Sequence, residues 1–282
     1  YVLMIYTQHT LPAPATEIIG REREADELRK LLLAEDVRLV TLTGPGGMGK
    51  TRLAIHVASL MTESFNDGVY FVPLAQVSDP ALFFLTLAQS LDIQPDTAQL
   101  LQEPVIRYFR QREVLLVLDN FEQIVGAAAD VALLLSSCPR LTILVTSRIV
   151  LHVRGEHEYP VLPLALPAVN ASMEVEALSH YASVLLFVQR ATAVRPDFRL
   201  TVANAAAIAE ICLRLDGLPL AIELAAARTK LLTPQAMLPR LQHRLQLLRG
   251  GAVDLPERQQ TLYNTIRWSY ELLDEQEQQV FN

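Results

Sequence analysis

The stretch "TLTGPGGMGKTRLA", residues 41–54, decides the fold of this chain. Its Gly44, Gly49, Lys50 and Thr51 match the pattern G-x-x-x-x-G-K-[ST] at the required spacing. Glycines let successive backbone N–H groups converge on one anion, in backbone conformations that other residues adopt only with strain. The stretch therefore predicts a phosphate-binding loop, in which Lys50 lies along the β and γ phosphates and Thr51 offers its hydroxyl to Mg²⁺.

The residues on either side supply the setting that such a loop requires. Residues 38–43 (RLVTLT) are typical of a buried strand, and apolar side chains recur at helical spacing after Thr51. A strand, a glycine loop and a helix in this order favour an anion site over a plain turn with an incidental lysine. We expect the nucleotide to contact Pro45, Gly46, Gly47, Met48, Gly49, Lys50, Thr51 and Arg52.

Composition and charge exclude several classes of protein. The 282 residues carry a formal net charge of −7, which argues against binding of DNA or RNA by charge alone. The sequence contains no apolar run long enough for a membrane helix and no signal segment, so we predict a cytoplasmic chain without a membrane partner. Cys138 and Cys212 lie far apart without a C-x-x-C pattern, which favours buried packing over a disulfide or a zinc site.

Further apolar runs alternate with helical patterns. Residues 68–74 (GVYFVPL), 114–119 (VLLVLD), 141–148 (LTILVTSR) and 157–164 (HEYPVLPL) are candidate strands. Helices are expected around residues 79–110, broken near Pro95, and over residues 122–135. Because the strands read as apolar throughout, the pattern predicts an α/β fold, a parallel sheet with helices on both faces.

The composition and the periodicity of the sequence change after about residue 165. Strand-like runs end there, and Ala and Leu dominate at helical spacing. We therefore expect an N-terminal arm or linker over 1–16, a phosphate-loop domain over 17–165 and an all-α domain over 166–250. Residues 251–282 stop inside a helical pattern, which indicates the truncated start of a third unit and a piece of a longer protein.

Site chemistry is expected just past the carboxyl ends of the strands. Asp119 follows "LLVL" there, and with Thr51 it is the predicted holder of Mg²⁺; a helix-capping aspartate is the alternative. Asn120 can position a water molecule but cannot take its proton. Glu122 is a candidate for the base that Asn120 cannot be. The alternative, a glutamate that only stabilises the start of a helix, fits the sequence about as well.

Arg148 ends the run "LTILVTSR", again just past a strand. A guanidinium at this place can contact the γ-phosphate and so distinguish ATP from ADP. The alternative is a salt bridge on a loop. Because the other nucleotide-binding motifs occur in the expected order along the chain, we favour the sensing role.

Taken in order, "IIGRE", "GPGGMGKT", "LLVLDN", "ILVTSR" and "GLPLAIELAA" resemble the signal-transduction ATPases with numerous domains, the STAND class. The chain is most similar to the NB-ARC domains of apoptotic-protease activators, plant disease-resistance proteins and large bacterial transcription regulators. The resemblance implies that Ile18, Ile19, Gly20 and Arg21 line the adenine and ribose, and that Leu218 and Pro219 pack on the base. The final segment resembles the first helix of a winged-helix domain.

This resemblance implies an ATP/ADP-binding regulatory switch, driven either by nucleotide exchange or by slow Mg²⁺-dependent hydrolysis of ATP. Its partners would be an adenine nucleotide, sensor and effector domains of the same polypeptide, and further copies of the chain in a nucleotide-dependent homo-oligomer. An AAA-type motor is disfavoured by Asn120 and the "GLPL" run. A scaffold that holds ADP without hydrolysing it stays open, and the rate of ATP turnover separates the three classes.

Overall fold

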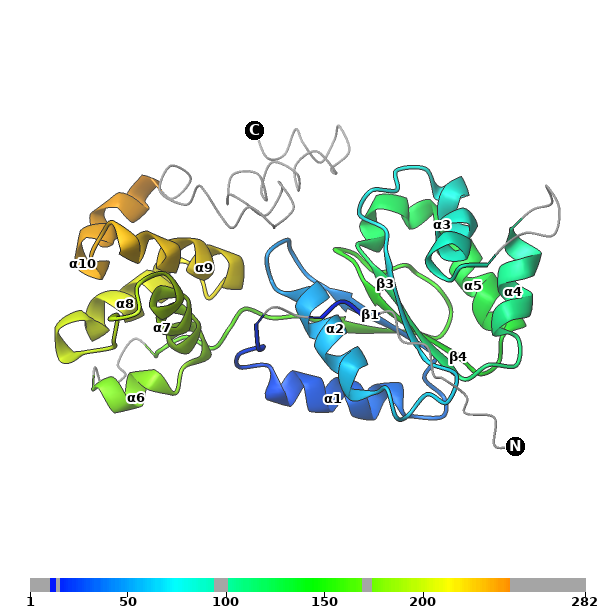
Figure 1. The fold of residues 1–282 in the computed structure, drawn as a ribbon, viewed down its shortest axis with the longest axis horizontal. Coiled ribbons are helices and arrows are strands. Elements are labelled where there is room, and N and C mark those ends of the chain that lie inside the picture. Colours follow the sequence, from blue (N-terminus) through cyan, green and yellow to red (C-terminus); the bar gives the residue numbers. More distant parts are fainter. Residues whose placement is uncertain (1–10, 14–15, 94–100, 169–173, 244–282) are drawn as a thin grey trace. The chain divides into compact units, whose positions relative to one another are not determined.

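The computed structural model describes residues 11–13, 16–93, 101–168 and 174–243, which form two compact units (Figure 1). The first unit comprises the described residues up to Gly44 together with Lys50–Val161, and the second comprises Pro45–Gly49 and the described residues from Leu162 onward. The predicted third unit, residues 251–282 with its winged-helix likeness, lies outside the described residues, as does Pro95.

The first unit is built around a sheet of five strands in the order β2-β3-β4-β1-β5. All neighbouring strands are parallel. The strands are β1 (Leu39–Thr43), β2 (Val69–Pro73), β3 (Val114–Asp119), β4 (Leu141–Thr146) and β5 (Glu156–Pro160). The α/β class and the parallel sheet that the sequence predicts are therefore confirmed.

Helices cover both faces of this sheet (Figure 1). The helices are α1 (Glu22–Leu32), α2 (Lys50–Leu60), α3 (Phe83–Ser90), α4 (Gln102–Phe109) and α5 (Ala128–Ser137). Figure 1 shows α1 and α2 on one face and α3, α4 and α5 on the other. The strands β3 and β4 are buried along their whole length, and successive side chains point to opposite faces of the sheet. Both strands are therefore mostly apolar, with Asp119 at the end of β3 and two buried threonines in β4.

The fifth strand differs from the prediction of strands that are apolar throughout. The sequence of β5 is EHEYP, and none of its residues is fully buried. It is an edge strand, and its carboxylates satisfy hydroxyls of the neighbouring strand: Thr41 Oγ1 donates to Glu156 Oε1 at 2.6 Å, and Thr43 Oγ1 donates to Glu158 Oε1 at 2.7 Å. Polar side chains are tolerated at this edge because one side of the strand lacks a neighbour.

The helix expected over residues 122–135 is also corrected. Residues Phe121–Ala127 form 3₁₀ turns, and Ile124 has non-helical backbone angles (φ −132°, ψ 42°). The regular helix α5 begins only at Ala128. The chain leaves β3 through Asn120 in the left-handed conformation, which prevents an α-helix from starting directly after the strand.

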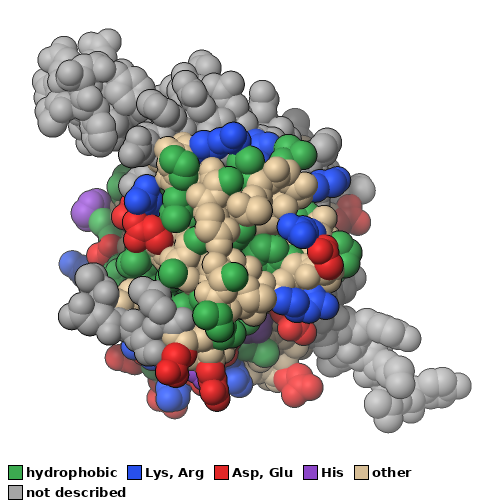
Figure 2. Space-filling view, turned by 90° about the vertical axis from the view of Figure 1, so that its left-hand side faces the viewer, with side chains coloured by type: hydrophobic (Ala, Val, Ile, Leu, Met, Phe, Trp, Pro, Cys, Tyr) green, Lys and Arg blue, Asp and Glu red, His purple; other side chains and the backbone are tan. Residues whose placement is uncertain are grey.

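The described part of the second unit is helical. Its helices are α6 (Val175–Ser179), α7 (Ala182–Val194), α8 (Val202–Arg214), α9 (Pro219–Ala227) and α10 (Pro234–Met237), with 3₁₀ turns at Arg228–Lys230 and Leu238–His243. Figure 2, in which this unit faces the viewer, shows hydrophobic side chains as separate spots and both acidic and basic side chains around the edge. Single exposed apolar residues such as Val202 and Leu231 are ordinary for a protein surface.

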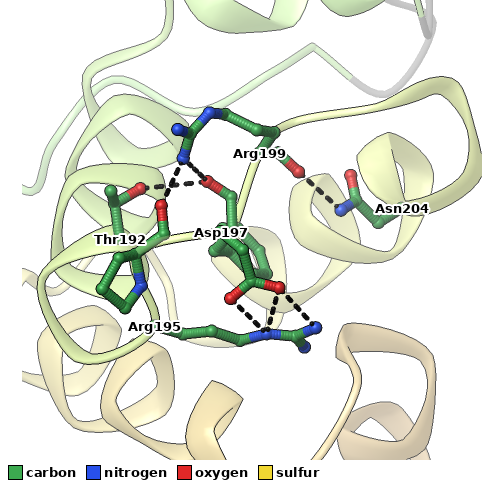
Figure 3. A network of polar contacts seen from close by, with 7 residues as sticks. Thr192, Arg195, Asp197, Arg199 and Asn204 are labelled. Carbon is green, nitrogen blue, oxygen red and sulfur yellow. Dashed lines mark hydrogen bonds and ion pairs between the residues drawn. The ribbon is translucent and has the colours of Figure 1, made fainter.

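The connection between α7 and α8 is fixed by polar contacts (Figure 3). Arg199 donates to the carbonyls of Pro196 and Phe198, both at 2.7 Å, while Asn204 Nδ2 donates to the Arg199 carbonyl at 2.9 Å. Asn204 also completes a capping box with Thr201 at the start of α8. The network therefore fixes the conformation of this connection and the start of α8.

Both cysteines, Cys138 and Cys212, are buried free thiols, as the sequence predicts. Across the described ranges of the chain, no helix has both the length and the apolar character needed to cross a membrane.

Candidate phosphate-binding site

The glycine loop follows β1 and leads directly into α2. Gly49, the residue before the helix, has φ +88°, a left-handed conformation that residues with a side chain rarely adopt. A Cβ atom at this position would meet no other atom within 4 Å. Backbone conformation rather than lack of space therefore accounts for the glycine at the last loop position of the motif.

Lys50 is the first residue of α2, and only 7% of its surface is exposed. Its ammonium group donates to the carbonyl oxygen of Gly44 at 2.6 Å. Burial lowers the pKa of Lys50 from its ordinary 10.5 to about 8; the charges of Glu122 and Asp119 oppose this effect, and that of Arg148 adds to it. A buried cation next to the loop is a group that an anion would stabilise.

The lowered pKa of Lys50 predicts that nucleotide binding depends on pH. Between about pH 8 and the ordinary pKa of 10.5, the unfolded chain keeps a proton that the nucleotide-free folded chain has lost, so the stability of the free chain should rise with pH in this window. Phosphate favours the protonated amine, so ADP affinity should fall by up to about tenfold per pH unit above pH 8. Titrations of ADP across this range test it.

Lys50→Arg is the matched variant for this experiment, because a guanidinium keeps its proton throughout the range. Its ADP affinity should change little with pH. A wild-type affinity as flat as that of Lys50→Arg would show that Lys50 does not carry the proton exchanged on binding.

Asp119 ends β3 and is 5% exposed. Its Oδ1 atom accepts two hydrogen bonds, one from Thr51 Oγ1 and one from Thr146 Oγ1, each at 2.6 Å. The structure thus brings together the two residues that the sequence predicts to hold Mg²⁺. A hydroxyl and a carboxylate are oxygen ligands of the kind that Mg²⁺ prefers, so the residues fit this ion.

Glu122 and Arg148 face one another in the same region. Arg148 Nε lies 3.4 Å from Glu122 Oε1, and the side chains are 13% and 5% exposed, respectively. Asn120 Nδ2 also donates to Glu122 Oε1, at 3.4 Å. The other carboxylate oxygen, Glu122 Oε2, is buried and accepts no hydrogen bond from the residues that the structure describes. A buried carboxylate oxygen without a donor is costly, so a water molecule or ligand group is expected to serve it.

The predicted adenine and ribose residues of the first unit lie around the start of α1. Ile18, Ile19 and Gly20 are half-buried, whereas Arg21 is buried and forms an ion pair with Glu24 at 2.8 Å. Arg52 donates to the carbonyl oxygens of Thr16 and Glu17, both at 2.9 Å. Arg52 therefore fixes the segment that precedes Ile18, and its contact with the nucleotide stays a prediction.

Leu218 and Pro219 lie in the second unit, where Pro219 is the first residue of α9. This position suits proline, because its fixed φ matches the helix and its missing N–H is not needed there. Gly217 precedes them with φ +68°, and a Cβ at Gly217 would approach the Leu164 carbonyl oxygen to 2.5 Å. The run "GLPLA" is thus a tight helix start, and its role at the base stays a prediction.

Thr146 is a site residue that the sequence reasoning missed. It is fully buried at the end of β4, and its hydroxyl contacts Asp119 in the neighbouring strand. The rule that polar residues at strand ends form the site led to Asp119 and Arg148. The same rule would have found Thr146, which directly follows the run "LTILV".

Residues 21–159 match the model of the NB-ARC domain. An uncharacterized protein of Mycobacterium tuberculosis is 40% identical over 273 residues, which covers 96% of this chain and 65% of the relative. A second M. tuberculosis protein, provisionally named an HTH-type transcriptional regulator, is 41% identical over 253 residues, covering 89% of this chain and 27% of the relative. The chain thus spans less than two thirds of the length of either relative.

A solved structure supports the fold alone. The structure of Drosophila ORC bound to DNA is similar with a TM-score of 0.54 at 14% sequence identity, and the match covers 84% of this chain and 70% of that chain. The family assignment rests instead on the domain match, which includes the glycine loop, Asp119 and Arg148. Residues 21–159 of this chain therefore match the NB-ARC family, in agreement with the resemblance that its motifs indicate.

Proposed function

We propose that this chain is the ATP/ADP-binding switch of a larger regulator, in which slow hydrolysis or exchange of the nucleotide controls conformation and oligomerisation. One observation carries the proposal: a buried lysine, a carboxylate held by two hydroxyls and a buried Glu122–Arg148 pair all lie in one region at the carboxyl ends of the strands. The chemistry of these groups suits a nucleotide with Mg²⁺.

Each group has a distinct role in this proposal. Lys50 binds the β and γ phosphates, and Thr51 and Asp119 hold Mg²⁺, which when bound neutralises phosphate charge. Glu122 orients a water molecule and accepts its proton; its unsatisfied Oε2 supports this role. Arg148 contacts the γ-phosphate. To do so, its guanidinium leaves the ion pair with Glu122 and binds the phosphate instead.

The proposed partners include further domains of the same polypeptide, because the relatives are longer than this chain. Both M. tuberculosis relatives extend beyond the matched region, so sensor and effector domains of the same polypeptide are the proposed recipients of the signal. We place the chain in the cytoplasm, and we propose that the exchange of ADP for ATP changes its association with further copies.

The rate of ATP turnover tests this function. The wild-type chain is expected to hydrolyse ATP slowly, because Asn120 stands where a second acid would accelerate the reaction. Glu122→Gln should lower this rate by about a hundredfold, since it removes the proton acceptor and keeps the shape of the side chain. Steady-state phosphate release with Mg²⁺-ATP measures both rates.

Glu113→Gln is the matched control, because Glu113 immediately precedes β3, at the opposite end of that strand from Asp119, and pairs with Arg140. It should retain the wild-type rate. A wild-type rate in Glu122→Gln would remove Glu122 from the mechanism. Rapid turnover by the wild-type chain would indicate a motor, and nucleotide binding without any turnover would indicate a scaffold.

A further inference from the structure

The hydroxyl of Thr146 connects β4 to the end of β3 and to the turn that follows β3. Its Oγ1 donates to Asp119 Oδ1 at 2.6 Å and accepts from the backbone N–H of Asn120 at 3.0 Å. The residue is fully buried at the carboxyl end of β4. The hydroxyl therefore uses both its donor and its acceptor capacity inside the protein.

Packing alone does not call for a hydroxyl at this position. The apolar residues of β4, such as Ile143 and Val145, are buried, and valine has nearly the shape of threonine without the polar atom. Burying a hydroxyl is costly unless it is hydrogen-bonded. The two contacts of Thr146 are thus what distinguish threonine from valine here.

Thr146 and Thr51 contact Asp119 from different parts of the fold. Both hydroxyls donate to the same oxygen of Asp119. Thr51, however, belongs to the glycine-loop motif and is itself a proposed ligand of Mg²⁺, whereas Thr146 belongs to the central sheet, where β4 pairs with β3. The sheet thus holds the carboxylate independently of the loop.

The same hydroxyl stabilises the turn that follows Asp119. Asn120 has φ 61° and ψ 45°, a left-handed conformation that is uncommon for residues other than glycine. Its N–H no longer takes part in the sheet and is satisfied by Thr146 instead. This turn leads to Glu122, so Thr146 supports both acidic residues of the site.

We propose that Thr146 is a positioning residue that orients the Asp119 carboxylate for the magnesium ion of a bound nucleotide. This inference rests on the proposed function. Thr146 contacts neither the nucleotide nor the ion in this account, and it acts through Asp119. Groups that orient a metal ligand in this way commonly contribute about ten- to a hundredfold to metal affinity.

The test compares Thr146→Val with Thr146→Ser in the full chain. ADP affinity is measured by calorimetry for each variant with Mg²⁺ and with EDTA, and the ratio of the two affinities gives the effect of the metal. Thr146→Val should reduce this ratio by about tenfold or more and leave the affinity in EDTA near the wild-type value. Thr146→Ser should keep most of the ratio, because it retains the hydroxyl.

A merely structural role predicts a different pattern. In that case Thr146→Val would weaken ADP binding equally with Mg²⁺ and with EDTA, a result that would overturn the proposal, as would an unchanged ratio. Thermal melting of the nucleotide-free variants reports any loss of fold. If Thr146→Val does not fold, Thr146→Ala, which also removes the hydroxyl, is measured in the same way.

A double variant tests whether Thr146 acts through Asp119. In the Asp119→Asn background, Thr146→Val should change the magnesium effect no further, because the group that it orients is already lost. An additional loss of similar size in the double variant would contradict the proposed route. A wild-type chain that binds no ADP would instead refute the proposed function, so the two failures are distinguishable.

Discussion

Lys50→Ala is expected to weaken binding of both ATP and ADP by about a hundredfold, which corresponds to about 3 kcal/mol. The variant removes charge-assisted hydrogen bonds to the phosphates, and these are the strongest polar contacts that the loop is expected to make. The fold should persist. The ammonium group contacts the Gly44 carbonyl, but its lowered pKa shows that the folded chain disfavours the charge at this place.

Calorimetric titration with each nucleotide measures this loss, and thermal melting of the free chain checks the fold. Lys30→Ala is a matched control, because Lys30 is exposed in the last turn of α1. It should bind both nucleotides as the wild type does. Unchanged affinities in Lys50→Ala would contradict the assignment of the glycine loop as the phosphate site.

Arg148→Ala is expected to separate the two nucleotides. If the guanidinium contacts only the γ-phosphate, ATP loses a charge-assisted hydrogen bond worth about 1.5 to 3 kcal/mol that ADP never makes. Affinity for a non-hydrolysable ATP analogue should therefore fall by about ten- to a hundredfold, while affinity for ADP stays nearly constant. The variant would favour ADP.

The structure adds a consequence for stability. Arg148 forms a buried ion pair with Glu122, so Arg148→Ala leaves that carboxylate without its cation, and the melting temperature of the free chain should fall. Titrations are therefore made well below the melting temperature. Arg140→Ala, near the opposite end of β4, is the matched control. Equal losses for ADP and the analogue in Arg148→Ala would show a general phosphate or structural contact.

Much of the fold could be predicted because the buried strands are mostly apolar. The strand β5 could not be predicted in detail, since its glutamates are accommodated by hydroxyls of β1 that lie more than a hundred residues away in the sequence. The 3₁₀ turns before α5 were likewise missed. They depend on the left-handed Asn120, whose N–H is held by Thr146 of another strand.

The candidate site, like the fold, could be predicted only in part. Lys50, Thr51, Asp119 and Arg148 could be located because each stands at a fixed place in a motif or directly after a strand. Which side chains contact one another could not be predicted in this way. The pairing of Arg148 with Glu122 and the contact of Thr146 with Asp119 both require the order β3-β4-β1, which the sequence pattern alone does not specify.

The most direct test of the nucleotide switch is a pair of calorimetric titrations of the wild-type chain, one with ADP and one with a non-hydrolysable ATP analogue, each in the presence of Mg²⁺. We expect saturable binding of one molecule of either nucleotide per chain, with both affinities strongly reduced when Mg²⁺ is replaced by EDTA. Absence of saturable binding for both nucleotides would contradict it.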